Sequence, residues 1–433
     1  MFVLYSILLA LGLAALAPLL WARNAPDGRY TRHLGERFGW LKPLATAGPG
    51  TIWLHAVSVG ETLAVERLIS LLKQRFPDRL VVLSVTTATG RSVAERRIPA
   101  DRIFYFPLDF RFATRRALKA MAPALVIITE TEIWPNFLRE AAAAGVPVMF
   151  LNGRISGRSY ARYRLVRKLL RPVLGAAAGF LMQTPTDAAR IEDLGARAEC
   201  VEVAGNLKFD WIPPDLPGFI RWLRAAFEHA GITEVIIAGS TMEGEEAQLL
   251  EVYRRLATPS RLLVLAPRHP QRFEAVAAEI GASGLPWAQR SRLIAGDGAF
   301  VPPGGVLLLD SLGELASAYQ LATVAFVGGT LGAFGGHNLL EPAYWGVPVT
   351  FGPHMENFAA IAEQFLAAGA AQGVASTVEL ERVWRRLLED AAERQRLGQA
   401  AQALLASQRG ATERALEAIA AQIQPAVSVQ SKL

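Results

Sequence analysis

Residues 327–348, VGGTLGAFGGHNLLEPAYWGVP, hold the group of this 433-residue chain best suited to binding chemistry. An apolar β-type run leads through five glycines into a predicted helix that begins near Asn338. A strand that passes through glycines into a helix N-terminus can bind an anion, because backbone N–H groups and the helix dipole point the same way. Glu341 lies in the first helical turn, where a carboxylate could accept hydrogen bonds from two ribose hydroxyls. Asn338 and Glu341 also fit a capping box, so a cap and a nucleotide site both stay open here.

Polar side chains also follow the strands predicted in the first half of the chain. Apolar runs alternate with helical segments, which is the pattern of a parallel sheet covered on both faces. Ligands of such sheets bind beyond the carboxyl ends of the strands. The hydroxyl, carboxylate and amide groups found there indicate a polar pocket that could hold a sugar. The runs are residues 51–57, 80–85, 103–106, 124–128, 146–151 and 180–182, and the residues at their ends include Ser58, Gly60, Glu61, Glu130, Asn152 and Arg154.

A second α/β alternation begins after residues 210–218, DWIPPDLPG, whose three prolines are typical of a linker. Strands are predicted at 234–238, 261–266, 306–309, 323–327 and 349–351, with Ser240, Thr241, Arg268, His269 and Pro270 at strand ends. The predicted fold class is therefore α/β, with two doubly wound Rossmann-like domains. The predicted segments are a membrane anchor over 1–22, an N-terminal domain over 23–209, a linker over 210–232, a C-terminal domain over 233–424 and a disordered tail over 425–433.

The first 22 residues contain no charged side chain and are long enough to span a bilayer, so we predict an N-terminal membrane-anchor helix that spans the bilayer or lies in its interface. Residues 1–205 carry 27 Lys and Arg against 16 Asp and Glu, whereas the remainder carries 18 against 23. A basic half that also holds the apolar segment favours an anionic lipid surface over nucleic acid as a partner. The single cysteine, Cys200, excludes an internal disulfide and fits a reducing compartment. The Arg-rich segment 156–174 fits either a solvated face or contact with phosphates.

Several catalytic classes lack their motifs. The turn after residues 51–57 is not G-x-G-x-x-G, and no P-loop occurs. No Asp-x-Asp pair is present to hold a metal-bound diphosphate, and the six histidines show no ligand spacing. We therefore predict chemistry without metal or cofactor, in which Arg268, helix N-termini and Lys208 stabilise a departing phosphate. His269 is interpreted as a turn residue beside Pro270, with a catalytic role as the alternative.

Seven motifs occur in fixed order along the chain. They are GERFG (35–39), HxVSVGE (55–61), ETExWPN (130–136), GNLKFD (205–210), STxxGEE (240–246), PRHPxRF (267–273) and VGGTLxxxGGHNxLEPA (327–343). Together they resemble one family, the 3-deoxy-D-manno-octulosonic acid (Kdo) transferases of lipopolysaccharide assembly. The resemblance extends from the N-terminus to about residue 358, with Thr330 where Ser is expected. It implies a two-domain glycosyltransferase of the GT-B type that uses CMP-Kdo and a lipid A precursor at the cytoplasmic face of the bacterial inner membrane.

The resemblance also implies residue roles. The Glu of GERFG is the family's general base, which gives that role to Glu36, although an isolated Glu of this kind is ordinarily a solvated side chain. The sugar and acceptor would face Ser58, Gly60, Glu61, Glu130, Asn152 and Arg154. The donor would be held by Arg268, His269, Pro270, Gly329, Thr330, Gly336, Asn338, Glu341, Lys208, Ser240 and Thr241. The alternatives are a membrane-associated glycosyltransferase that uses a UDP-sugar, and a non-catalytic protein that binds nucleotide or lipid.

Overall fold

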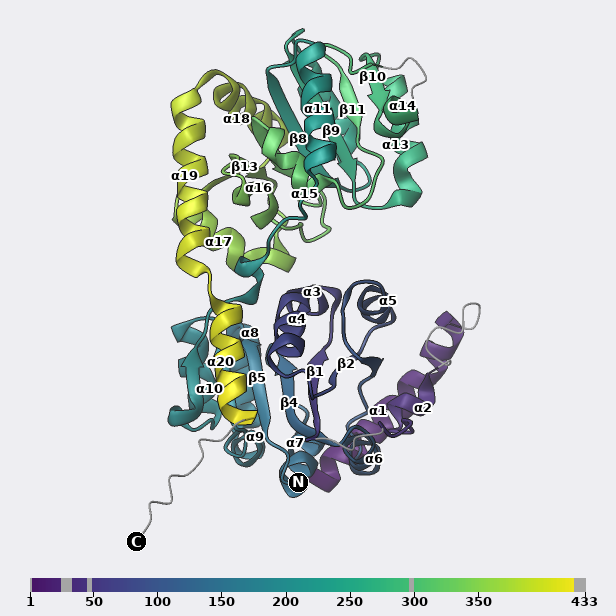
Figure 1. Ribbon diagram of the computed structural model, residues 1–433, viewed down its shortest axis with the longest axis vertical. Helices are drawn as coiled ribbons and strands as arrows, with labels where there is room; N and C mark the ends of the chain where they lie inside the picture. Colours follow the sequence, from purple (N-terminus) through teal and green to yellow (C-terminus); the bar gives the residue numbers. More distant parts are fainter. Residues whose placement is uncertain (1, 25–32, 45–48, 296–299, 424–433) are drawn as a thin grey trace. The chain divides into compact units, whose positions relative to one another are not determined.

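The computed structural model describes residues 2–24, 33–44, 49–295 and 300–423, and these residues form two α/β units (Figure 1). Unit 1 contains the described residues up to Asp210 together with helix α20 (Ala411–Ile423), and unit 2 is Trp211–Ser407. Each unit has one seven-stranded sheet. All pairings in both sheets are parallel. The predicted α/β class with two parallel sheets is confirmed.

The sheet of unit 1 has the strand order β3-β2-β1-β4-β5-β6-β7. Its central strands are buried along their whole length, which explains their near-continuous apolar sequences. The chain reverses its direction of growth across the sheet between β1 and β4, and such a switch point is where ligands of open sheets bind. The strands are β1 (Thr51–Ala56), β2 (Val81–Val85), β3 (Arg102–Tyr105), β4 (Pro123–Thr129), β5 (Val148–Gly153), β6 (Gly179–Met182) and β7 (Val201–Val203).

Helices cover both faces of this sheet. One face packs against α6, α7, α9 and α10 around an aromatic group centred on Trp53. The other packs against α4, α5 and α20. The helices are α1 (Phe2–Asn24), α2 (Leu34–Arg37), α3 (Val59–Ala64), α4 (Glu66–Arg75), α5 (Ala88–Arg97), α6 (Arg111–Met121), α7 (Pro135–Ala143), α8 (Gly157–Leu165), α9 (Arg167–Leu174) and α10 (Pro185–Leu194).

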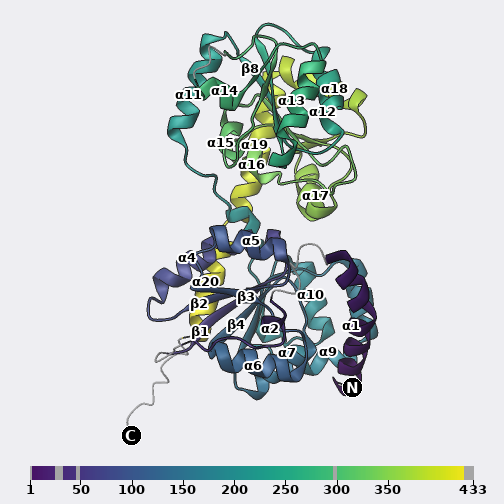
Figure 2. The same cartoon turned by 90° about the vertical axis from the view of Figure 1, so that its right-hand side faces the viewer.

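The sheet of unit 2 has the order β10-β11-β9-β8-β12-β13-β14, with its switch point between β8 and β12. Helices α12, α13 and α18 pack on one face and α11 packs on the other (Figure 2). The strands are β8 (Glu234–Thr241), β9 (Arg261–Pro267), β10 (Trp287–Gln289), β11 (Val306–Leu308), β12 (Val324–Val327), β13 (Val349–Phe351) and β14 (Ala371–Gly373). The helices are α11 (Pro217–His229), α12 (Glu245–Arg254), α13 (Phe273–Ala282), α14 (Arg290–Ala295), α15 (Leu315–Ala318), α16 (Leu340–Tyr344), α17 (Ala359–Ala367), α18 (Thr377–Glu389) and α19 (Ala391–Gln408).

The boundaries between the units differ from the predicted segments 210–232 and 233–424. Only the stretch before Pro217 is irregular, because α11 begins there with proline in its first turn, where the missing N–H costs nothing. Leu223 and Phe227 of α11 are buried in the core of unit 2. At the other end, α20 returns to unit 1, where the Asp210 carboxylate accepts hydrogen bonds from the backbone N–H groups of Gly410 (2.7 Å) and Thr412 (2.6 Å). The predicted disordered tail, 425–433, lies outside the described residues.

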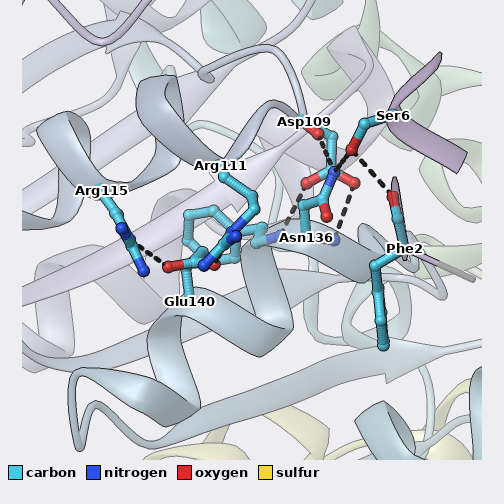
Figure 3. Close-up of polar contacts among 8 residues, drawn as sticks. Phe2, Ser6, Asp109, Arg111, Arg115, Asn136 and Glu140 are labelled. Atoms are coloured by element: carbon cyan, nitrogen blue, oxygen red, sulfur yellow. Dashed lines mark hydrogen bonds and ion pairs between the residues drawn. The ribbon is translucent and has the colours of Figure 1, made fainter. Parts of the chain in front are cut away.

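Helix α1 makes polar contacts with the rest of unit 1 (Figure 3). Asn136 donates a hydrogen bond from Nδ2 to the Ser6 hydroxyl (3.0 Å). The Tyr5 hydroxyl is hydrogen-bonded to the buried Asp109 carboxylate. Phe2 packs against the core, and Arg139 lies over its ring. The same close-up shows Glu140 of α7 paired with two arginines of α6.

Within the part of the chain that the structure describes, no helix combines the length and the apolar character needed to cross a membrane. The predicted bilayer-spanning anchor over residues 1–22, and the inner-membrane localisation that depended on it, are therefore wrong. The other predicted form, in which this segment lies in the bilayer interface, stays a prediction. In this chain, α1 directs Phe2, Tyr5 and Ser6 to the rest of unit 1. Its other described apolar side chains are exposed, among them Leu4, Leu8 and Leu11.

Candidate active site

Glu36 lies on α2, at the carboxyl ends of β2 and β3. Its Oε2 accepts hydrogen bonds from the Arg91 guanidinium (2.6 Å) and from the backbone N–H of Tyr105 (2.8 Å). His33 Nδ1 lies 3.5 Å from Oε1, and 22% of the Glu36 side chain is exposed. Because Oε2 is occupied by an ion pair and a backbone donor, Oε1 is the oxygen that can accept a proton from another molecule.

Two guanidinium groups lie over the Tyr105 ring, and one of them, that of Arg91, pairs with the Glu36 carboxylate. The Arg37 and Arg91 guanidinium carbons lie 4.2 and 4.9 Å from the centre of the Tyr105 ring, so both groups make cation–π contacts with it. Arg91 also pairs with Glu95 at 2.7 Å, and Arg37 donates to the carbonyl of Thr86 at 2.7 Å. These contacts fix the two arginines beside Glu36 and make its surroundings suitable for an anionic substrate.

Glu61, at the β1/β4 switch point, has a structural role. Its carboxylate accepts hydrogen bonds from the backbone N–H groups of Val57 (2.9 Å) and Ser58 (3.1 Å) and from the Thr129 hydroxyl (2.7 Å). The Ser58 hydroxyl accepts from the Glu61 N–H, which completes a capping box. At Gly60, the nearest atom to an added Cβ would be the Ser58 hydroxyl oxygen at 3.9 Å, so the fold leaves space there.

Glu130 and Asn152 end their strands in the left-handed region, with φ of +54° and +58°. Each such residue costs about 1–3 kcal/mol and persists only where the surroundings fix it. Asn152 is fixed by Leu207, whose N–H donates to Oδ1 (3.0 Å), and by Gln183, which donates to its carbonyl (2.9 Å). The Arg154 backbone is held by the Thr131 hydroxyl, and its side chain is exposed.

Charges at this edge influence one another. Burial and then the charge of Glu61 raise the pKa of Glu130, whereas Lys208 and Arg154 lower it. Lys208 thus belongs to unit 1 and acts on Glu130, although the sequence grouped it with the donor residues. Burial, followed by the charges of Glu61 and Glu130, raises the pKa of Glu132 to about 7. Glu132 was not among the predicted site residues, because nothing in its local sequence indicates a raised pKa.

In unit 2, Ser240 and Thr241 end β8. Ser240 has φ of +57°. The hydroxyl of the buried Thr241 donates a hydrogen bond to Glu246 (2.8 Å), and the Thr241 carbonyl accepts one from the Arg268 N–H (3.0 Å). Glu246 is fully buried and forms two hydrogen bonds with Arg272, at 2.7 and 2.9 Å. The strand end is therefore held by an internal ion pair, and the Thr241 hydroxyl is directed to that pair.

The glycine turn after β12 is filled by a protein carboxylate. Glu245, which is 1% exposed, accepts hydrogen bonds from three consecutive N–H groups, those of Gly329 (2.6 Å), Thr330 (2.8 Å) and Leu331 (2.9 Å). It also accepts from the Met242 N–H (2.8 Å). The N–H groups that the sequence offered to a donor phosphate are thus already occupied. The prediction overlooked Glu245 because that residue lies 84 positions before Gly329.

Two other predicted donor residues also have structural tasks. The buried Thr330 hydroxyl donates to the carbonyl of Val327 (2.7 Å) and accepts from the Gly352 N–H (2.8 Å). Gly336, with φ of +73°, closes the turn through its N–H to the Gly329 carbonyl (2.8 Å), and an added Cβ would lie 2.5 Å from the Met355 sulfur. Glycine is required there by both backbone and space.

Arg268, Asn338 and Glu341 remain together as a candidate donor site. Asn338 donates from Nδ2 to Glu341 (3.3 Å) and accepts from the Leu340 N–H (3.1 Å). Burial raises the pKa of Glu341, whereas the Asn338 hydrogen bond and the Arg268 charge lower it. The helix that follows, α16, has five residues, so its dipole is small. His269 and Pro270 form an exposed turn that leads into the 3₁₀ segment Pro270–Arg272.

These groups define what the site can do. Unit 1 presents a partly exposed carboxylate paired with Arg91, and unit 2 presents a cation, an amide and a half-buried carboxylate suited to phosphate and ribose. Among the described residues, no group of three or more His, Cys, Asp or Glu side chains could hold a metal ion. Chemistry without a metal or cofactor stays a prediction.

Comparison with known proteins identifies the class. Residues 32–211 match the family model described as 3-deoxy-D-manno-octulosonic-acid transferase. A UDP-GlcNAc 2-epimerase from Neisseria meningitidis, bound to UDP-GlcNAc, shares the fold with a TM-score of 0.57 at 12% identity, over 86% of this chain and 99% of that one. The chain thus has a two-domain fold of the GT-B type and is a glycosyltransferase.

Full-length relatives give the family. The 3-deoxy-D-manno-octulosonic acid transferase of Bordetella pertussis is 40% identical over 94% of this chain and 97% of its own length. The enzyme of that name from Haemophilus influenzae is 34% identical over 90% of this chain and 91% of its own. The chain belongs to the 3-deoxy-D-manno-octulosonic acid transferase family.

Proposed function

We propose that this enzyme transfers Kdo from CMP-Kdo to a lipid A precursor, lipid IVA, in lipopolysaccharide core biosynthesis, with inversion at the anomeric carbon. The observation that carries the proposal is family membership at 40% identity over 94% of the chain. The polar groups at the carboxyl edges of both sheets support it, because a transferase needs a site for a nucleotide and a site for a sugar.

Unit 2 would bind the donor. Arg268 faces the phosphate, since a guanidinium fork matches two phosphate oxygens, and Glu341 with Asn338 receives the ribose hydroxyls. The half-buried position of Glu341 beside Asn338 supports this role, because ribose hydroxyls would supply hydrogen bonds that its carboxylate loses on burial. The Gly329–Leu331 turn would line the site without donating backbone hydrogen bonds to the donor, since its N–H groups already donate to Glu245.

Unit 1 would carry the general base. Oε1 of Glu36 takes the proton from an acceptor hydroxyl. The oxygen of this hydroxyl then forms a bond to the anomeric carbon of Kdo. The bond from this carbon to the CMP phosphate oxygen breaks, and CMP leaves with the electron pair. Arg91 holds Oε2 at 2.6 Å, which directs Oε1 to the reacting hydroxyl. Arg37 and Arg91 would favour the anionic acceptor.

The remaining edge of unit 1 would bind the acceptor sugar or Kdo. Glu130, Asn152 and Arg154 are its polar groups, and the space beside Gly60 would admit a ligand. Glu61 would act indirectly, because its carboxylate already holds two backbone N–H groups and a hydroxyl.

Purified protein incubated with CMP-Kdo and a tetraacylated lipid A precursor tests the proposal. Mass spectrometry should detect a lipid that carries one or more Kdo residues, together with released CMP. A parallel incubation with UDP-sugars should give no glycolipid. Product only from a UDP-sugar, or no Kdo-bearing lipid from protein that is folded, would overturn the proposal.

A further inference from the structure

His337, in the glycine turn of unit 2, has a buried ring nitrogen without a partner. Its Nε2 makes no hydrogen bond to any of the residues that the structure describes. The ring lies against Gly329, where an added Cβ would be 3.0 Å from both Cδ2 and Nε2. A buried polar nitrogen of this kind is costly to leave unpaired, so native structures usually supply it with a ligand or an ordered water.

The surroundings of His337 are those of the candidate donor site. The residue precedes Asn338, and the charges of Arg268 and His269 reach its ring. Burial, followed by these two positive neighbours, lowers the pKa of His337 to about 4. The imidazole is therefore neutral at physiological pH and carries one N–H. Beside Arg268, the favourable partner for that N–H is an anionic oxygen.

His55 of unit 1 shows that an unpaired imidazole nitrogen does not by itself indicate a ligand. Its Nε2 is also buried without a partner among the described residues, and burial lowers its pKa to about 3. However, the ring stacks 3.8 Å from Phe106 inside the core, and Nδ1 contacts the Ser84 hydroxyl at 3.0 Å. His337 differs because its neighbours are an arginine and polar residues at a strand end.

We propose that His337 is a donor-binding residue, whose neutral imidazole donates an Nε2–H hydrogen bond to an anionic oxygen of the CMP-sugar. The proposal rests on the proposed function, since it takes CMP-Kdo as the donor. Two groups of that donor offer such an oxygen, the phosphate and the sugar carboxylate. Gly329 leaves space for the His337 ring, because a side chain at position 329 would contact it.

Nitrogen NMR of the wild-type protein tests this directly. With ¹⁵N-histidine labelling, only six residues contribute ring signals, and His337→Gln assigns the one that disappears. CMP-Kdo should shift the His337 Nε2 signal and leave the neutral tautomer in place. A shift already present with CMP alone would assign the phosphate as partner, and a shift only with CMP-Kdo would assign the sugar carboxylate.

Donor affinity of variants gives the second measurement. His337→Leu removes the donor N–H and should weaken CMP-Kdo binding about tenfold, whereas His337→Gln keeps an N–H and should lose less. His55→Gln is the matched control and should leave the affinity unchanged. A wild type that binds CMP-Kdo with no Nε2 shift, or a folded His337→Leu with wild-type affinity, overturns this inference alone. A folded wild type that binds no CMP-Kdo overturns both this inference and the proposed function.

Discussion

The switch points of the two sheets are built alike, with a buried glutamate in each. In unit 1, Glu61 follows β1 and receives the Thr129 hydroxyl from the end of β4. In unit 2, Glu245 follows β8 and receives three N–H groups from the turn after β12. Both carboxylates occupy the place where an open α/β sheet ordinarily binds its ligand's anion. The difference lies in the hydrogen-bond donors that come from the neighbouring strand. Glu61 accepts from one side chain there, whereas Glu245 accepts from three consecutive backbone N–H groups of the glycine turn.

This comparison changes how the glycine turn is understood. Glycines allow the backbone to point successive N–H groups at one spot, and such a spot attracts an anion from any source. Here the anion belongs to the protein. We therefore propose that the donor is recognised by side chains around the turn, namely Arg268, Asn338 and Glu341, with His337 as the inferred addition.

The largest effect is expected at Glu245. Glu245→Gln replaces one of two oxygens that together accept four N–H groups, and it turns an NH₂ group toward backbone donors. We expect the free energy of unfolding of unit 2 to fall by about 3 kcal/mol, with a loss of CMP binding. Urea unfolding and calorimetric titration with CMP would measure both quantities. Glu243→Gln, an exposed residue between β8 and α12, is the control. An equal loss of stability and of CMP binding in the two variants would refute the role of Glu245.

A smaller effect is expected at Glu61. Glu61→Gln disturbs two N–H groups and one hydroxyl, so the free energy of unfolding should fall by about 2 kcal/mol. CMP binding should stay at the wild-type level, because the donor residues belong to unit 2. Glu192→Gln on α10 serves as the exposed control. If Glu61→Gln lowered the free energy of unfolding and CMP binding as much as Glu245→Gln does, the proposed difference between the two glutamates would be contradicted.

The smallest effect concerns pH. The pKa of Glu132 is raised to about 7 by burial and by Glu61 and Glu130, against a usual value of 4.5. The folded state therefore holds a proton that the unfolded state has released between these values, so stability is fully present at low pH and declines as pH rises toward 7. The urea midpoint of the wild type should decrease over this window more steeply than that of Glu132→Gln. Parallel curves for the two proteins would contradict the assignment.

Much of the fold follows from local patterns. The central strands are predictable because burial on both faces forces continuous apolar runs, as in Val81–Val85. Strands β7, β10 and β14 have three residues each and lie at sheet edges, so they show no period that a sequence reading can detect. The N-terminal apolar run led to the prediction of a spanning helix, because hydropathy alone does not fix how an apolar helix meets a membrane.

The positions of two site residues were predictable from local pattern, since Arg268 follows strand β9 and Glu341 lies in the first turn of α16, as expected. Their roles stay predictions, as does the role of Glu36, which came from the family resemblance. The site was not predictable where a contact joins distant segments. Glu245 and Gly329 are 84 residues apart, and the sequence shows two ordinary motifs at these positions. The same holds for His337, whose unpaired nitrogen is a property of packing and is not visible in the motif GGHN.

The central claim is that Glu36 serves catalysis, unlike Glu61 and Glu245, which serve the fold. The most direct measurement is the rate of Kdo transfer by Glu36→Gln, compared with Glu95→Gln, which alters the other partner of Arg91. Glu36→Gln should lower the rate about a hundredfold or more, since it removes the proton acceptor, and should leave folding and CMP affinity unchanged. Glu95→Gln should transfer Kdo at close to the wild-type rate. A folded Glu36→Gln that transfers Kdo within a few-fold of the wild type would contradict the claim.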